Sequence, residues 1–195
     1  MKFAFLTYQF ARYPLEYCFR MAKEYGFEGV EVWGARPHAY APDMDREAVN
    51  AVLGWKKQYG IEVSMFTPEI LAYPYSLVSA SQKERRETID YLIRSVETAA
   101  AIGTDKMQIT AKHPGYGRDR EEVWDMLTEG VGALCRRAEQ VGVDVIMESL
   151  SPSEGNVITT ADDIAALQRR VGSHDLCTIC LLYTSPSPRD RSVSR

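Results

Sequence analysis

The sequence has no long apolar segment, little excess charge and no leader-like start, and each of these shortages excludes a class of protein. No apolar run approaches the roughly 20 residues that a membrane-spanning helix needs. The start, MKFAFLTYQF, lacks the apolar core and small-residue cleavage site of a secretory signal. The net charge is −4, and residues 1–179 hold 20 basic and 26 acidic residues. We therefore expect a cytoplasmic protein with no nucleic-acid partner and no membrane contact.

The four cysteines lack the pattern of a disulfide framework or a structural zinc site. Cys18 and Cys135 fall on apolar faces of expected helices, and Cys177 and Cys180 lie in or beside an expected strand. The last two have CxxC spacing, but no second pair exists and their flanks are apolar. We expect reduced cysteines that serve as core residues.

Short β-rich runs alternate with longer amphipathic stretches along the chain. The expected strands are Lys2–Thr7, Gly29–Trp33, Ile61–Phe66, Lys106–Thr110, Val143–Glu148 and Leu176–Ile179. The expected helices are Pro14–Tyr25, Asp45–Tyr59, Ser81–Ile102, Asp119–Val141 and Thr160–Val171. Four helices end at a glycine that leads into the next apolar run, as in YGFEGVEVW and VGVDVIMES. Ser81 and Glu84 have the spacing of a capping box.

This alternation predicts a parallel sheet, either a doubly wound open sheet or a (β/α)8 barrel. The sequence TYQFARYP after the first strand lacks the Gly-rich phosphate loop of a dinucleotide-binding sheet. The loops after the strands are long and aromatic, as at the catalytic face of a barrel. A full barrel needs about 250 residues, and this chain has 195. We predict an α/β fold, an incomplete (β/α)8 TIM barrel with five complete units and the start of a sixth.

The last sixteen residues, CLLYTSPSPRDRSVSR, begin directly after Ile179, where the final expected strand is interrupted. Three Arg and one Asp make a poor basic tail for a partner, and a disordered terminus would follow a finished domain. The stretch CLLYTSPSPRD instead resembles the translation of a transposon-type sequencing adapter. We expect a partial barrel domain over residues 1–179 and a non-native or disordered tail over residues 180–195.

Polar side chains follow the ends of the expected strands, which meet at the rim where a barrel binds its substrate. Glu148 ends an apolar strand, and Glu154 follows six residues later in a Ser/Pro loop. A buried strand-end carboxylate is costly unless a metal, a cation or a reaction requires it. Glu148 can also be read as a salt-bridged strand end, and Glu154 as a solvated loop residue.

Three further residues take similar positions: Trp33 at the end of the second strand, Glu69 after the third and His113 after the fourth. A lone loop histidine is more often a surface residue than a ligand. The convergence of these residues on one rim favours a polar, sugar-sized substrate. The same strands and loops also hold Glu31, Arg36, His38, Tyr40, Tyr73, Tyr75 and Tyr116, of which the tyrosines can equally serve packing.

Three stretches, EVWGARPHAYAPD, FTPEILAYPY and ESLSPSEGNV, together resemble the sugar isomerase/epimerase superfamily with a xylose-isomerase-like barrel. Within it the resemblance is to fructoselysine 3-epimerases and, more widely, ketose 3-epimerases, and it runs from about Met1 to Ile179. It implies a small-molecule sugar substrate and one divalent metal ion (Mn, Co, Mg or similar) held by two Glu, one Asp and one His. A homo-oligomer is one expected state of the full-length protein.

The resemblance also implies roles for individual residues. Glu148 matches a metal ligand that is also the acid/base at C3 of the substrate, and Glu154 matches a Glu that contacts the substrate. His113, Trp33 and Glu69 are substrate-binding candidates at the rim. The Asp ligand is expected about two residues after Ile179, where Leu181 stands. Three of the four ligands are thus absent, and we expect the metal site of this chain to be incomplete.

Several alternatives remain open. A hydroxypyruvate isomerase, an aldose–ketose isomerase or an inosose dehydratase of the same superfamily would use the same strand-end Glu. A nuclease of the superfamily is not among them, because it would need more His and acidic ligands and a basic face, neither of which appears in the sequence. The chain can also be a non-catalytic fragment, because a barrel without two strands exposes sheet edges and apolar surface. We predict poor solubility and no metal-dependent epimerase activity for the 195-residue chain.

Overall fold

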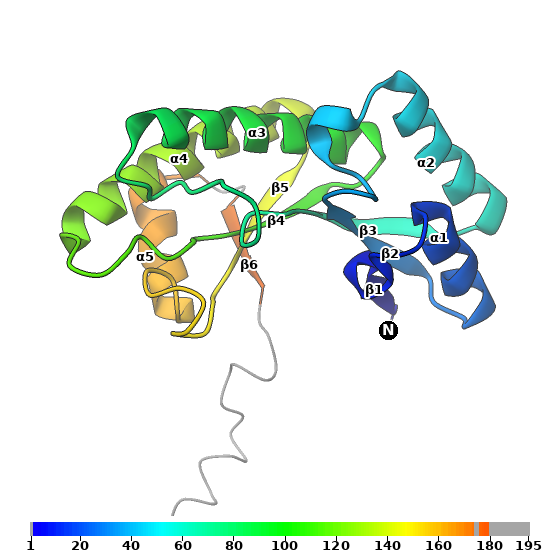
Figure 1. Cartoon of the computed structure of the whole chain (residues 1–195), viewed down its shortest axis with the longest axis horizontal. Coiled ribbons are helices and arrows are strands. Elements are labelled where there is room, and N and C mark those ends of the chain that lie inside the picture. The colour runs from blue at the N-terminus through cyan, green and yellow to red at the C-terminus, as the bar shows by residue number, and fades with distance from the viewer. Residues whose placement is uncertain (1, 174–175, 180–195) are drawn as a thin grey trace, which may run out of the picture.

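The computed structural model describes residues 2–173 and 176–179, which form one curved parallel sheet with helices along its outer side (Figure 1). The six strands follow one another in the sheet in the order of the sequence. They are β1 (Ala4–Leu6), β2 (Gly29–Gly34), β3 (Glu62–Pro68), β4 (Lys106–Thr110), β5 (Asp144–Glu148) and β6 (Leu176–Ile179). A doubly wound sheet would reverse its strand order, so this order confirms the barrel prediction. Within the described residues β1 and β6 are the edges of the sheet, which therefore holds six of the eight strands of a TIM barrel.

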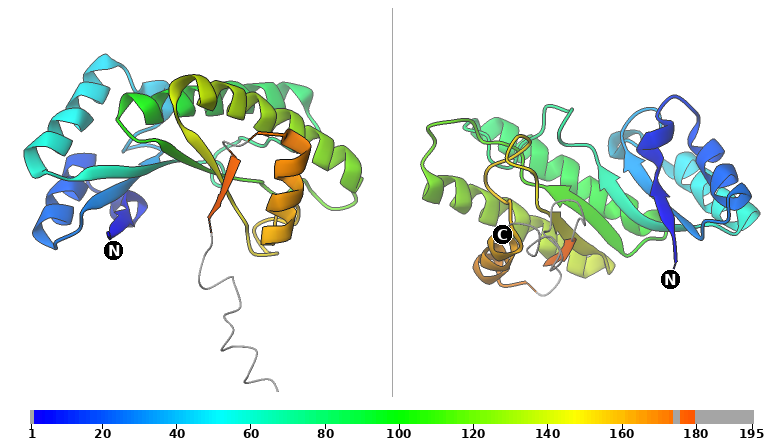
Figure 2. Two further views of the ribbon diagram at one scale, coloured as in Figure 1. Left: turned by 180° about the vertical axis from the view of Figure 1, so that it is seen from behind. Right: turned by 90° about the horizontal axis from the view of Figure 1, so that it is seen from below.

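In the described part of the chain five α-helices connect the strands, and together they cover one face of the sheet (Figure 2). They are α1 (Leu15–Glu24), α2 (Arg46–Tyr59), α3 (Gln82–Ala101), α4 (Arg120–Val141) and α5 (Ala161–Val171). Right-handed crossovers between neighbouring parallel strands place every helix on the same side, which leaves the other face as the inner wall. Short 3₁₀ helices η1 (Thr7–Phe10) and η2 (Ala41–Asp43) lie in the loops after β1 and β2.

The sequence patterns predicted the helix starts well, and two local details were wrong. The first strand is shorter than expected, because Thr7 already belongs to η1. At the start of α3, Ser81 Oγ accepts from the backbone N–H of Glu84 (3.3 Å), but the Glu84 carboxylate accepts from Ser79 Oγ (2.6 Å). The reciprocal bond of a capping box is therefore missing there. A complete capping box forms instead at the start of α5, between Thr160 and Asp163.

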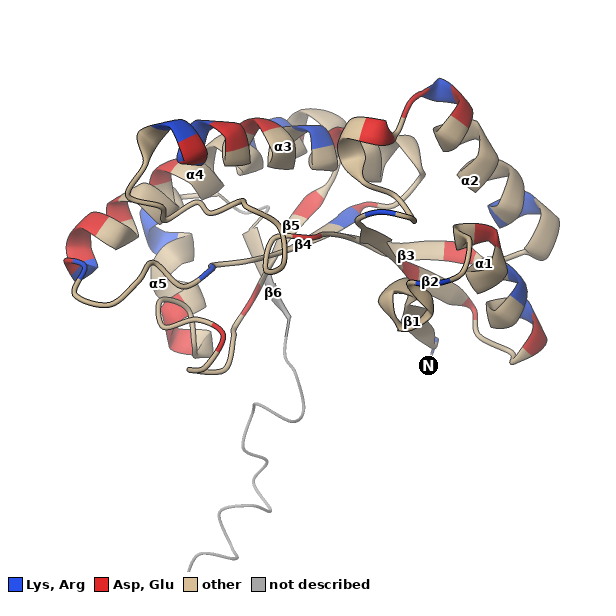
Figure 3. Ribbon diagram, in the orientation of Figure 1, with Lys and Arg blue, Asp and Glu red and all other residues tan. Residues whose placement is uncertain are grey.

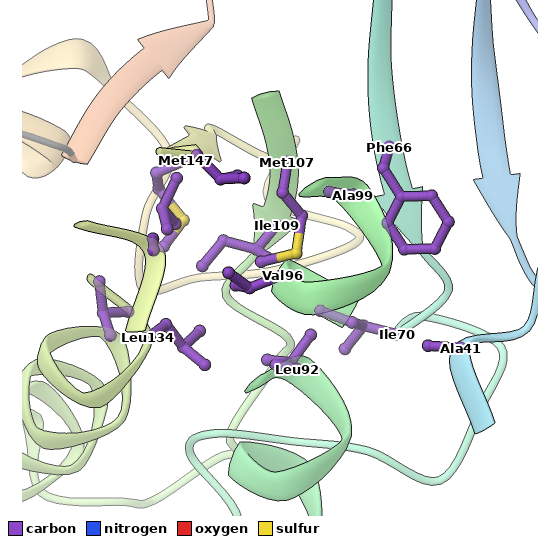
Figure 4. Close-up of a cluster of buried hydrophobic side chains, with 14 of the residues drawn as sticks. Ala41, Phe66, Ile70, Leu92, Val96, Ala99, Met107, Ile109, Leu134 and Met147 are labelled. Atoms are coloured by element: carbon purple, nitrogen blue, oxygen red, sulfur yellow. The ribbon is translucent and has the colours of Figure 1, made fainter. Parts of the chain in front are cut away.

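The core lies between the outer face of the sheet and the long helices α3 and α4 (Figure 4). Alternation along each strand directs every second side chain to this layer. The residues labelled there include Phe66, Met107, Ile109 and Met147 from the strands and Leu92, Val96, Ala99 and Leu134 from the helices, all of which are buried. Cys18 and Cys135 are also buried, as expected of core cysteines.

The outward faces of the helices carry charges of both signs (Figure 3). An example is the ion pair between Arg137 of α4 and Glu97 of α3, 2.8 Å apart and partly exposed. Such surface pairs contribute little to stability. No helix in the described part of the chain is long and apolar enough to cross a membrane. Cys180 and the whole predicted tail, residues 180–195, lie outside the described residues, so the domain division stays a prediction.

Candidate active site

Glu148 is the last residue of β5, and its side chain lies on the inner wall of the sheet. Strands β4 and β5 run in register with Thr110 beside Glu148, and Gln108, two residues earlier, shares the same face. Gln108 Nε2 donates a hydrogen bond to Glu148 Oε2. Burial raises the pKa of Glu148, the hydrogen bond from Gln108 opposes that rise, and the charges of Glu31 and Glu154 add to it. The result is a half-buried carboxylate with increased proton affinity, which suits a general base.

A second half-buried carboxylate, Glu31, lies on the inner face of β2. It accepts a hydrogen bond from Thr67 Oγ1 of β3 (2.6 Å). Burial raises the pKa of Glu31, and the hydrogen bond from Thr67 partly opposes the rise. The sequence placed Glu31 within a strand but gave it no role. Its neighbours Val30 and Val32 are fully buried on the opposite face, and that alternation is the signal that marks Glu31 as an inner-wall residue.

Glu154 lies in the loop after β5 and is exposed. Its carboxylate accepts a hydrogen bond from Ser151 Oγ (2.6 Å). Its charge contributes to the raised pKa of Glu148, so these two predicted site residues lie within electrostatic range of each other. The assignment of Glu154 to substrate contact stays a prediction.

Trp33 and Glu69 are brought together at the ends of β2 and β3. Trp33 Nε1 donates to Glu69 Oε2 (2.9 Å), and the backbone N–H of Ala72 donates to Glu69 Oε1 (2.8 Å). The ring of Tyr8, which is half exposed, meets the Trp33 ring edge-on with centroids 5.0 Å apart. An aromatic face beside a carboxylate at the rim is suited to contact a sugar, and the predicted substrate role of these residues remains to be tested.

His113 lies in the loop after β4. Its Nδ1 accepts from the backbone N–H of Gly115 (2.9 Å), so the neutral ring carries its proton on Nε2. That Nε2 is buried and has no hydrogen-bond partner among the described residues. Its ring meets Tyr116, which is 91% exposed. No described hydrogen bond or ion pair joins His113 to Glu148, so its predicted role at the site also stays a prediction.

The tyrosines of the loops after β2 and β3 pack against one another. Tyr40 Oη and Tyr75 Oη are 2.6 Å apart, and the Tyr75 ring stacks on Tyr91 of α3 with centroids 4.0 Å apart. Tyr73 meets Tyr40 edge-on at 5.4 Å. The packing explanation therefore accounts for Tyr40, Tyr73 and Tyr75. Arg36 forms an exposed ion pair with Asp43 (2.5 Å), and His38 lies between Thr7 Oγ1 and the Tyr13 carbonyl.

The inner wall offers part of a metal site. Glu148 is a half-buried carboxylate whose pKa is raised mainly by burial and further by the charges of Glu31 and Glu154, and such a group fits one carboxylate contact to a divalent cation. Within residues 2–173 and 176–179, however, no group of three or more His, Cys, Asp or Glu could hold a metal ion. Leu181, where the next ligand was expected, lies outside the described residues. The described residues therefore fit a single ligand and not a complete site.

Comparison with known proteins agrees with this architecture. Residues 19–181 match the family described as xylose isomerase-like TIM barrel. The chain belongs to this family. It is 34% identical over 191 residues to fructoselysine 3-epimerase of Shigella flexneri, a match that covers 96% of this chain and 69% of that protein. Fructoselysine 3-epimerase of Escherichia coli O157:H7 is also 34% identical, with 96% of this chain and 70% of that protein covered.

Two solved structures share the fold of this chain. A 3-keto-D-glucoside 4-epimerase from E. coli matches with a TM-score of 0.75 and 18% identity, over 91% of this chain and 67% of that one. D-psicose 3-epimerase from Clostridium cellulolyticum H10, solved with D-tagatose, matches with a TM-score of 0.77 and 16% identity. That match covers 91% of this chain and 62% of the epimerase. At these identities the likeness concerns the fold alone.

Proposed function

We propose that this protein is a sugar epimerase that inverts C3 of a ketose or ketosamine such as fructoselysine. The observation that carries the proposal is the 34% identity to fructoselysine 3-epimerase over 96% of the chain. The inner wall supports it, because Glu148 is a half-buried carboxylate whose pKa is raised by burial. Epimerisation needs such a group to take a proton from carbon near neutral pH.

In the proposed reaction Glu148 removes the C3 proton. The C3–H bond breaks, and its electron pair becomes conjugated with the C2 carbonyl as an enediolate. A second, protonated Glu, expected after the sixth strand, then gives its proton to C3 on the opposite face. A divalent metal ion such as Mn²⁺, Co²⁺ or Mg²⁺ would supply polarisation of the C2 oxygen, and Glu148 is the described residue that would hold it. Trp33, Glu69, His113 and Glu154 would contact the sugar around this point.

Proton exchange and inversion can be measured separately by NMR in D₂O. Fructoselysine and D-fructose are incubated with the protein, with and without Mn²⁺, and deuterium at C3 and conversion to the epimer are followed. The incomplete ligand set predicts no turnover by this chain; where exchange is nevertheless measured, Glu148→Gln should lower both rates by about 10²–10⁴-fold. Glu139→Gln, on the exposed side of α4, is the matched control and should behave as the unmodified chain. Equal rates for all three proteins would refute the role of Glu148.

A second candidate is a chain that folds without turning over a sugar. It is favoured by the lack of a three-ligand group among the described residues and by the 69% coverage of the curated relative. A folded chain that exchanges no deuterium at C3 would support this candidate. An aldose–ketose or hydroxypyruvate isomerase would instead move the carbonyl group, which the same spectra would show as a different product.

A further inference from the structure

Thr110, the last residue of β4, has a buried hydroxyl that no neighbour uses. The residue is 9% exposed, and its Oγ1 has no hydrogen-bond partner within the described part of the chain. Buried hydroxyls are nearly always hydrogen-bonded, because an unpaired one costs the free energy of its lost solvation. An exception of this kind requires an explanation, and a ligand that completes the bond is one.

The position of Thr110 on the sheet supports a ligand. It pairs with Glu148 in the parallel register of β4 and β5, on the same face as Gln108, which donates to Glu148. On the other side β4 pairs with β3, at Phe66 and Met107, and Glu69 directly follows the end of β3 at Pro68. Thr110 therefore lies on the strand between β5, which ends at Glu148, and β3, which Glu69 follows.

The spacing suits a sugar. Neighbouring strands are about 4.8 Å apart, so β3 and β5 are separated by about 10 Å. A six-carbon ketose fits across this width, and its middle hydroxyls would then face Thr110. A threonine hydroxyl both donates and accepts one hydrogen bond, which matches the hydroxyl of a sugar.

We propose that the Thr110 hydroxyl hydrogen-bonds a hydroxyl group of the substrate and so holds the sugar beside Glu148. The identity of the ligand, a polyhydroxylated ketose or ketosamine, rests on the proposed function. Thr110 takes no proton from carbon in this scheme, and its contribution is to binding and orientation. The fold retains an unpaired buried hydroxyl at this position because the substrate completes its hydrogen bond.

The test compares two threonine-to-valine substitutions at buried positions. Thr110→Val removes the unpaired hydroxyl at constant shape. Thr88→Val is the matched control, because the fully buried Thr88 hydroxyl donates to the Glu84 carbonyl (2.7 Å) and accepts from the Ser76 N–H (2.9 Å). We expect Thr110→Val to unfold at the same or a higher urea concentration than the unmodified chain, and Thr88→Val to unfold at a lower one.

Binding gives the decisive readout. By isothermal titration, we expect Thr110→Val to bind D-fructose and fructoselysine about ten-fold more weakly, the loss of roughly one hydrogen bond. Thr110→Ser, which keeps the hydroxyl, should restore the affinity. Unchanged affinity in folded Thr110→Val would overturn the proposal, as would the absence of sugar binding by the folded unmodified chain.

Failure of the proposed function would look different. Sugar binding that depends on Thr110, without deuterium exchange at C3 in the presence of Mn²⁺, would refute the epimerase and leave the binding role intact. Deuterium exchange that depends on Glu148 but is unchanged by Thr110→Val would support the epimerase and refute the binding role of Thr110.

Discussion

Replacing Gly34 by alanine should strain the rim at the point where β2 meets β3. A Cβ at Gly34 would lie 2.7 Å from Phe66 Cζ and 2.7 Å from Pro68 Cα. Both contacts are shorter than van der Waals contact, and Pro68 Cα belongs to the backbone of the strand paired with Gly34. Phe66 is fully buried, so neither neighbour can move without disturbing the core or the sheet.

The expected cost follows from overpacking. Forcing one extra methyl group into a packed site costs about 1–3 kcal/mol of unfolding free energy. The same substitution at Gly54 is the control, because Gly54 lies on the exposed side of α2 with nothing within 4 Å of its would-be Cβ. There alanine should stabilise by about 0.5–1 kcal/mol, through helix propensity alone. Two variants of identical composition should therefore differ by about 1.5–4 kcal/mol.

Urea unfolding followed by tryptophan fluorescence measures this difference as a shift of midpoint at constant slope. In Gly34→Ala the wavelength of the native-state emission should also change, because displacement of Pro68 would lengthen the 2.9 Å hydrogen bond that Trp33 Nε1 donates to Glu69. Equal midpoints for the Gly34→Ala and Gly54→Ala proteins would show that the sheet accommodates the added methyl group at no cost in stability, and would refute the predicted overpacking.

Three further predictions test the helix cap, the buried carboxylate and the core. Asp163→Ala should lower the free energy of unfolding by about 1–2 kcal/mol in thermal melts. Burial alone would raise the pKa of Asp163, but hydrogen bonds from Thr159 and Thr160 hold the pKa below 3.8. The ionised carboxylate therefore stabilises the fold at neutral pH and stops doing so when acid protonates it, a loss of stability that the Asp163→Ala protein should not show. Burial raises the pKa of Glu148 above 4.5, so the stability of the unmodified chain should fall as the pH rises from 4.5 through the folded-state pKa. Glu148→Gln should therefore be more stable than the unmodified chain at neutral pH. Melts of the variant that show the same fall between acid and neutral pH would contradict the assignment. Leu134→Ala, at a fully buried position of α4, should cost about 2–5 kcal/mol by urea unfolding, and a change under 0.5 kcal/mol would contradict the packing shown in Figure 4.

Local patterns predicted most elements because their causes are local. The five residues expected to begin the helices, Pro14, Asp45, Ser81, Asp119 and Thr160, are the N-caps of the structure. N-cap residues and C-terminal glycines act on backbone groups within one helical turn, so both can be recognised in the sequence. The prediction of a capping box at Ser81 was wrong because the Glu84 carboxylate accepts a hydrogen bond from Ser79 instead. The spacing of Ser81 and Glu84 does not reveal this competing donor.

The sequence by itself determined that strands and helices alternate, that the sheet is parallel, and that Glu148 ends a buried strand at the rim. The tertiary structure decided which side chains meet there. Glu31 and Glu148 are 117 positions apart in the sequence, and only the curvature and register of the sheet bring their charges within range. Among residues 2–173 and 176–179 the same register leaves the Thr110 hydroxyl unpaired beside Glu148, because hydrogen-bond satisfaction depends on neighbours from other strands and is not encoded at any one position.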